Sequence, residues 1–232
     1  MPKNERPFSH APDEDGASEG NDGASKGKPK RANDKRERIL RAAIQVFARK
    51  GFYATRVSEI AKAAGVADGT IYLYFENKDH VLVSIFEDRI TKLIEVLRRE
   101  IEEAEGFENK LRRVVELQLG LLEGQRDLAE VITVNLRQSS TLLKQYAAPL
   151  FTEYLELIAG VIAEGQREGI VRSDLGPRVV SRALWGALDG VALTWALGSS
   201  KGGKPESLRR AATQIATVFL QGMFLEGVRE DA

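Results

Sequence analysis

The chain of 232 residues is long enough to bury a substantial core and to form one or two domains. Lysine plus arginine and aspartate plus glutamate number 34 each, so the overall charge indicates neither nucleic acid nor membrane as a partner. Cysteine is absent, which excludes disulfides, thiolate metal sites and cysteine nucleophiles. The two histidines, His10 and His80, are too few for the usual histidine-based catalysis. We therefore expect no enzyme, no catalytic or metal-binding residues and no cofactor.

Residues 1–32 are rich in glycine, proline, serine and charged side chains, and we predict a disordered arm there because such a segment buries little apolar surface. Its end carries four basic residues, Lys26, Lys28, Lys30 and Arg31, and no acidic one. The chain has no run of about 18 apolar residues and no apolar signal segment at its start. We expect a cytoplasmic protein without membrane insertion.

Three helices are predicted next, within a domain at 33–79, and the last two of them are short. The first runs from an N-cap at Asn33 to Gly51, and the second from a cap at Thr55 to Gly65. The third covers about 68–74, with Asp68 as a candidate cap. Such a set is typical of a helix-turn-helix domain, in which the last helix enters the major groove of DNA.

The rest of the chain, residues 80–232, also has helical periodicity. A long helix begins at Asn77, and its apolar residues recur with a 3.6-residue period up to Ile101. Further helices are predicted near 108–124, 126–140, 145–168, 177–198 and 205–227. The fold class is therefore all-α, with about nine helices, and the second domain is expected to bind a ligand and to dimerise.

The stretch VADGTIYLYF at 66–75 has the β-branched and aromatic content of a strand, but the neighbouring helices leave room only for two helical turns. Ile71 and Phe75, four residues apart, are predicted to pack inward, while the orientation of Leu73 stays open. The hydroxyl groups of this stretch are suited to hold phosphates; they belong to Thr70, Tyr72 and Tyr74.

Local charge favours DNA as the partner of this domain. Residues 26–79 hold 13 basic and 6 acidic side chains, a net charge of +7, whereas residues 80–232 have a net charge of −3. A helical corner within an ordinary core would give the same periodicity, so DNA binding and a structural role both remain open on pattern alone. Gly69 disfavours helix and indicates a close approach by DNA or by a neighbouring helix.

Residues 38–82 resemble the DNA-binding domain of the TetR family of transcriptional regulators, with the pattern F..KGF..T.V..IA..AGV..GT.Y.YF..K..L visible in order. The resemblance implies a homodimer on a palindromic, double-stranded operator. It also implies contacts to phosphates or bases. The candidate residues are Thr55, Arg56, Ala67, Asp68, Gly69, Thr70, Tyr72, Leu73, Tyr74 and Lys78.

A narrower resemblance, carried by the segments GVADGTIYLYFENKDHVLVSIF, NLRQSS and WGALDGVALTWAL, is to the fatty-acid-degradation branch of that family. It implies a repressor released from DNA by long-chain acyl-CoA. The alternative is a regulator of the same family that senses a drug or another lipophilic small molecule. A helical enzyme or lipid carrier is the rival outside the family.

The ligand region is predicted from apolar helices around the long helix. An apolar pocket for an alkyl chain and an ordinary bundle core are both compatible with the pattern. Arg137 and Gln138 either meet the ligand at the pocket mouth or satisfy helix carbonyls, and Asp189 pairs with Arg182 or across a dimer. The candidate ligand residues are Phe86, Ile90, Leu93, Leu136, Arg137, Gln138, Tyr154 and Asp189.

Small residues in the last two helices permit close packing of helices from two subunits. In the first of these helices they are Ala183, Gly186, Ala187, Gly190 and Ala192, and in the second Ala211, Ala212 and Ala216. We predict a dimer contact of four helices there.

Overall fold

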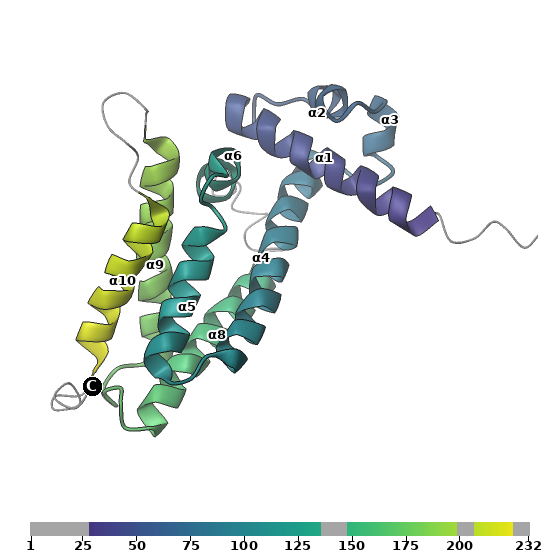
Figure 1. Ribbon diagram of the computed structural model, residues 1–232. Helices are drawn as coiled ribbons and strands as arrows, with labels where there is room; N and C mark the ends of the chain where they lie inside the picture. Colours follow the sequence, from purple (N-terminus) through teal and green to yellow (C-terminus); the bar gives the residue numbers. More distant parts are fainter. Residues whose placement is uncertain (1–27, 136–147, 199–206, 225–232) are drawn as a thin grey trace, which may run out of the picture.

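The computed structural model describes residues 28–135, 148–198 and 207–224, and these are helical nearly throughout (Figure 1). Within these ranges no strand forms, and only an isolated bridge joins Val171 to Phe224. The all-α prediction is confirmed. The helices are α1 (Lys28–Lys50), α2 (Val57–Ala64), α3 (Asp68–Ile71), α4 (Lys78–Glu103), α5 (Phe107–Gly120), α6 (Arg126–Glu130), the π-helix η1 (Val131–Asn135), α8 (Ala148–Arg167), α9 (Pro177–Leu197) and α10 (Leu208–Met223).

The first helix is longer than its sequence pattern predicts. It begins at Lys28 and not at an N-cap at Asn33, so residues 28–32, expected in the disordered arm, are helical. Among residues 33–50 of this helix, Ile39 is the first that is buried. The helix ends as predicted, before Gly51, whose φ of 78° lies in the left-handed region that glycine adopts without strain.

The helix-turn-helix unit follows, with two corrections to its caps. Helix α2 starts after Arg56 and not after Thr55, and Gly65 ends it in the left-handed conformation at φ 63°. Helix α3 has Ala67 as its N-cap, so Asp68 is its first helical residue and not the cap. The α-helix stops at Ile71, earlier than expected, and the following residues continue as tight turns.

Helix α4 connects the two parts of the molecule (Figure 1). Its N-terminus is capped as predicted by Asn77, whose side chain accepts a hydrogen bond from the backbone amide of His80 at 2.8 Å. The helix has 26 residues and is therefore about 39 Å long at about 1.5 Å per residue. Its first turns pack with α1, and its later turns pack with α5 and α8.

The C-terminal body is a bundle in which α5 and α8 pack against the later part of α4, α9 packs against α8 and α5, and α10 packs against α5 and α9 (Figure 1). The predicted helix at 108–124 ends earlier, at Gly120. The predicted helix at 126–140 is instead a short α-helix, α6, which changes to the π-helix η1 at Val131. The end of that predicted helix lies outside the described residues. Gly165 marks tight packing, because an added Cβ would lie 2.7 Å from the ring of Phe107.

Two hydrophobic cores fill the molecule. The N-terminal core combines residues of α1–α3 with the first turns of α4, and it also includes Leu128 of α6 and Val131 of η1. The second core fills the bundle. Phe86 and Leu122 pack against both cores. The N-terminal domain is therefore completed by side chains from far along the chain.

Candidate DNA-binding site

The stretch 66–75 forms α3 and the turn after it, and its side chains divide between core and surface. Ile71 and Phe75 are buried, as expected, at 0% and 1% exposure. Tyr72 and Leu73 are exposed at 58% and 80%, which settles the open orientation of Leu73. Tyr74 is half-buried and packs against the N-terminal core. This end of α3 therefore presents one tyrosine hydroxyl and one leucine to the outside.

The start of α3 is exposed and carries small side chains. Ala67, Asp68 and Gly69 are exposed, and Thr70 is half-buried. A Cβ placed on Gly69 would have no protein atom within 4 Å among the described residues. A neighbouring helix therefore does not explain this glycine, and the approach of an outside molecule remains as the predicted reason.

Thr55 and Arg56, the two candidates before α2, differ in accessibility. Thr55 is 3% exposed, and its hydroxyl donates a hydrogen bond of 2.8 Å to the carbonyl oxygen of Gly51. A buried hydroxyl that is already bonded does not fit the predicted phosphate contact. Arg56 is exposed, and its backbone amide donates to Glu59 at 3.0 Å.

Lys78 also departs from its predicted role. Its ammonium group donates to the carbonyl oxygens of Phe52, Tyr53 and Thr55 at 2.8, 3.2 and 2.9 Å. The same nitrogen lies 4.5 Å from the centre of the Phe52 ring. An ammonium has three N–H donors, and all three are used here within the protein. A phosphate contact does not fit this arrangement, and the lysine instead fixes the loop at residues 51–56, which we call the junction loop.

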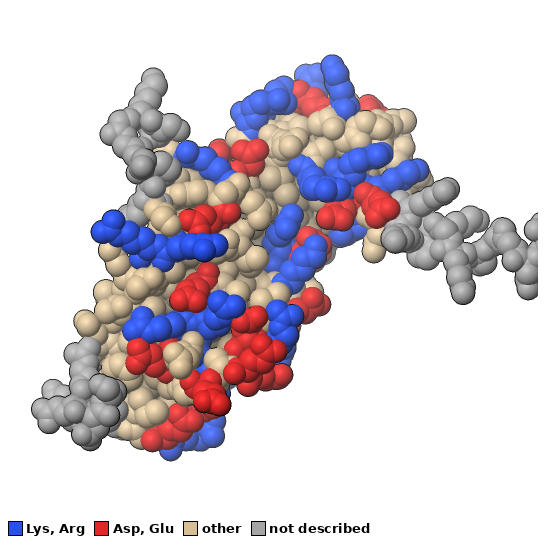
Figure 2. Space-filling model, viewed as in Figure 1, with Lys and Arg blue, Asp and Glu red and all other residues tan. Residues whose placement is uncertain are grey.

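Basic side chains gather over α1 and α2, whereas both charge signs alternate along the body (Figure 2). Lys50 at the end of α1 forms an ion pair with Glu59 of α2. The hydrogen bond from Lys50, followed by that from the Arg56 amide, lowers the pKa of the Glu59 carboxyl, which therefore stays ionised. The pair links α1 to α2 and sets the start of the second helix.

Two surface features of this domain were not predicted. Tyr53 is 69% exposed in the junction loop, while its neighbour Phe52 is 3% exposed. Adjacent aromatic residues in a loop give no periodicity, so the sequence does not indicate which of them points outward. His80 has a structural position, because its Nδ1 accepts a hydrogen bond from the Glu76 amide at 3.2 Å and its ring packs edge-on against Phe75.

The predicted ligand residues that the structure describes lie on three helices of the body. Phe86, Ile90 and Leu93 of α4 face the body core, Tyr154 belongs to α8, and Asp189 belongs to α9. Helix α8 packs against both α4 and α9. Leu136, Arg137 and Gln138 lie outside the described residues.

Tyr154 is 1% exposed, and its hydroxyl is hydrogen-bonded to the side-chain oxygen of Gln118. Burial raises the pKa of its phenol. Arg182 donates to the carbonyl oxygen of Arg178 at 3.0 Å, on its own helix. The predicted pairing of Arg182 with Asp189 is not among the hydrogen bonds and ion pairs seen in the described residues.

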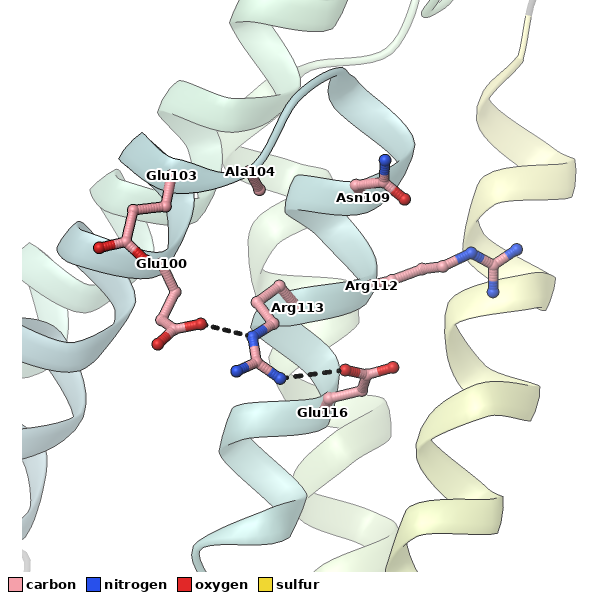
Figure 3. A pocket seen from close by; sticks show the side chains of 7 residues that line it. All are labelled: Glu100, Glu103, Ala104, Asn109, Arg112, Arg113 and Glu116. Atoms are coloured by element: carbon pink, nitrogen blue, oxygen red, sulfur yellow. Dashed lines mark hydrogen bonds and ion pairs between the residues drawn. The ribbon is translucent and has the colours of Figure 1, made fainter.

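A pocket of about 330 Å³ lies elsewhere, between the end of α4 and the start of α5 (Figure 3). It is lined by Glu100, Glu103, Ala104, Asn109, Arg112, Arg113 and Glu116. Arg113 lies between Glu100 and Glu116, at 2.6 and 3.4 Å. The hydrogen bond from Arg113 lowers the pKa of Glu100, and the hydrogen bond to Glu100 raises the pKa of Arg113. None of the predicted ligand residues that the structure describes lines this polar surface pocket, and it does not resemble a site for an alkyl chain.

The helix-turn-helix domain, with its exposed α3 and basic surroundings, defines a DNA-binding regulator of transcription. Comparison with known families agrees: "Bacterial regulatory proteins, tetR family" matches residues 39–85, and "YsiA-like protein, C-terminal region" matches residues 86–219. The chain belongs to the TetR family of bacterial transcriptional regulators. Its relatives are regulators and not enzymes.

Similar proteins include regulators of fatty acid metabolism. The fatty acid metabolism regulator protein of Bacillus subtilis (strain 168) is 36% identical over 74% of this chain and 89% of its own length. The fatty acid degradation regulator FadR from Bacillus halodurans is 35% identical, with a TM-score of 0.73 over 80% of this chain and 98% of that chain. FadR from Bacillus subtilis, in complex with stearoyl-CoA, is 33% identical, with a TM-score of 0.74 over the same shares of the two chains.

Among the described residues no helix is both long enough and apolar enough to cross a membrane.

Proposed function

We propose that this TetR-family regulator represses genes of fatty acid degradation, binds a palindromic operator as a homodimer, and leaves the DNA when it binds long-chain acyl-CoA. The observation that carries the proposal is the similarity, along nearly the whole of their chains, to two FadR structures, one of which holds stearoyl-CoA. The similarity covers both the DNA-binding domain and the body. It therefore favours acyl-CoA over an unrelated lipophilic ligand.

The exposed surface of α3 and its following turn supports the DNA-binding part. We place the operator against Tyr72, Leu73 and the open backbone at Gly69, with Arg56 at the start of α2 beside it. A side chain or backbone that is exposed and not used in packing is available for phosphates and base edges. Two half-sites then require α3 of the two subunits to lie about 34 Å apart, or a multiple of that distance.

The predicted ligand residues on α4, α8 and α9 support the effector part. Phe86 and Leu93 are only partly buried and pack against the body core, so they lie at the border of the apolar region. The acyl chain would enter between these three helices, where it meets apolar side chains. The charged CoA group would remain outside, because burial of unpaired phosphates is costly.

The dimer is placed on the outer face of α9 and α10. Val179, Ala183, Gly186, Gly190 and Leu197 of α9 are exposed, and they recur at intervals of three, four and seven residues, which places them along one face. Val218 of α10 is 67% exposed as well. In contrast, four small residues that were predicted to join this contact are buried in the core of their own subunit: Ala192 of α9 and Ala211, Ala212 and Ala216 of α10.

The test is a titration of the full chain on its operator, identified by selection from genomic DNA fragments. Fluorescence anisotropy is measured with stearoyl-CoA, free stearate and CoA alone at matched ionic strength, since phosphate contacts depend on salt. Release by stearoyl-CoA but not by CoA supports the proposal. Equal operator affinity with and without acyl-CoA removes the effector assignment, and the absence of any specific DNA fragment removes the repressor assignment.

A further inference from the structure

Helix α6 and the π-helix η1 lie between the two parts of the protein. They contact α1 of the DNA-binding domain on one side and α9 of the body on the other. Leu128 and Val131 belong to the N-terminal core, although they are distant from it in sequence. The segment therefore joins the body to the domain that holds α3.

A buried hydrogen bond joins this segment to the junction loop. Asn135, the last residue of η1, is 2% exposed, and its Oδ1 accepts a hydrogen bond of 2.8 Å from the backbone amide of Phe52. Phe52 is itself 3% exposed. A buried backbone N–H requires an acceptor. The DNA-binding domain receives this one from the segment that contacts the body.

The junction loop is thus held from two directions. Lys78, the first residue of α4, binds the carbonyl oxygens of Phe52, Tyr53 and Thr55, while Asn135 binds the Phe52 amide. The loop leads directly into α2, and α2 packs against α3. The position of η1 relative to α4 therefore sets the geometry of the loop from which the helix-turn-helix starts.

The π-helical form of η1 suggests how the hydrogen bond between Asn135 and Phe52 would open. Such segments are rare, usually short, and occur often at functional sites. A π-helical turn contains one residue more than an α-helical turn would. Return to α-helical pairing would rotate the residues at its end by about 100°, the angle of one residue in a helix with 3.6 residues per turn. That rotation would carry the side chain of Asn135 away from Phe52.

We infer that Asn135 is a positioning residue that couples the body to the DNA-binding domain. Its bond to the Phe52 amide holds the domain in the orientation that binds the operator, and the effector-bound state is the one in which the bond is open. The effector part rests on the proposed function. The hydrogen bond between Asn135 and Phe52, and its effect on operator affinity in the absence of effector, do not depend on the proposed effector.

Asn135→Ala removes the acceptor and is compared with Thr133→Val. Thr133 lies in the same π-helix and is equally buried, and its hydroxyl donates to Ala129 within the same segment at 2.7 Å. We expect Asn135→Ala to weaken operator binding without effector by a factor within the range of about 5 to 150 that is typical of allosteric coupling. We also expect the ratio of operator affinities without and with stearoyl-CoA to approach one. Thr133→Val keeps the wild-type affinity and ratio.

If Asn135 is purely structural, Asn135→Ala lowers the melting temperature but leaves both the operator affinity and the affinity ratio at their wild-type values, which would overturn the inference. Amide hydrogen exchange at Phe52 in the unmodified chain provides a second measurement that does not depend on the folding of a variant. We expect faster exchange when stearoyl-CoA is bound, and unchanged exchange in a protein that does release its operator would overturn the inference. If the wild type binds its operator but ignores stearoyl-CoA, the proposed effector fails, and the operator affinity of Asn135→Ala alone still tests the bond.

Discussion

The Nζ atom of Lys78 lies 2.8 Å from the carbonyl oxygen of Phe52 and 4.5 Å from the centre of the same residue's ring. One side chain at the start of α4 thus binds the backbone and the aromatic face of a residue that lies 26 positions earlier. The contact makes the long helix and the DNA-binding domain a single unit at this point.

Replacement of Lys78 by methionine keeps most of the apolar side chain but removes three hydrogen bonds to carbonyl groups, two of which are partly buried. We expect the free energy of unfolding to fall by about 1–3 kcal/mol, as measured by urea denaturation. The salt dependence of operator binding should keep its slope, because no phosphate contact is lost. A slope smaller by about one would show that Lys78 touches a phosphate after all. Lys62→Met, at an exposed position on α2, is the control for stability and should change it by less than about 0.5 kcal/mol.

Tyr72→Phe removes an exposed hydroxyl at the end of α3. Stability should change by less than about 0.5 kcal/mol because the ring is 58% exposed. Operator affinity should fall about fivefold, which corresponds to about 1 kcal/mol for one hydrogen bond. Tyr53→Phe, at an exposed tyrosine of the junction loop, is the matched control in anisotropy titrations. An equal loss in both variants would show that the effect is not specific to the α3 turn.

Gly69→Ala places a methyl group in open space on α3. Because alanine favours helix over glycine by about 1 kcal/mol, the variant should be as stable as the wild type or more stable. If DNA approaches the backbone there, operator affinity should nevertheless fall about tenfold or more. Gly160→Ala on α8 is the matched control, since its Cβ also meets no neighbour. Unchanged operator affinity in Gly69→Ala would remove this glycine from the interface.

Gly186→Arg tests the proposed dimer face. The residue is exposed on α9, and its Cβ position has no protein atom within 4 Å, so the subunit itself has space for the change. An arginine in a close helix contact between subunits should shift the protein to monomers in light scattering after size-exclusion chromatography and abolish operator binding at nanomolar protein. Gly160→Arg on α8 should leave the mass unchanged. If Gly186→Arg remains a dimer, the contact between subunits does not lie on this face of α9.

The buried phenol of Tyr154 should make the free energy of unfolding depend on pH in the alkaline range. Burial raises the pKa of its phenol above the ordinary value of about 10, so the neutral form is favoured in the folded state. A group with a raised folded pKa contributes fully below its unfolded pKa and loses that contribution as the pH rises above it. The free energy of unfolding should therefore decline from about pH 10 upward. In Tyr154→Phe the decline should be smaller, and the loss of the bond to Gln118 should cost about 0.5–1.5 kcal/mol at pH 7. Equal pH profiles in urea denaturation would contradict this assignment.

The sequence predicted the helices that are defined by local signals. Gly51, Gly65 and Asn77 end or begin helices where expected, because a left-handed glycine or an N-cap depends on a few neighbouring residues. The inward packing of Ile71 and Phe75 follows from their spacing.

Features that depend on contacts between distant residues could not be predicted from the pattern. Thr55 and Lys78 look like phosphate ligands in sequence, yet their donors are used by carbonyls in the junction loop. A single helix was predicted over 126–140, and no local signal marks the change to a π-helix at Val131. The hydrogen bond between Asn135 and Phe52 spans 83 positions, and no local signal indicates it.

Two buried side chains of the N-terminal core, Leu128 and Val131, come from helices that follow α5 in the chain. A fragment ended at Glu103 would lack both, and its Phe52 amide would lose the acceptor at Asn135. Such a fragment is expected to lose part of its melting cooperativity and to bind DNA poorly even though every residue of α1–α4 is present. The complete chain, by the same reasoning, should unfold in one calorimetric transition, with the stability of the DNA-reading part set partly by the bundle.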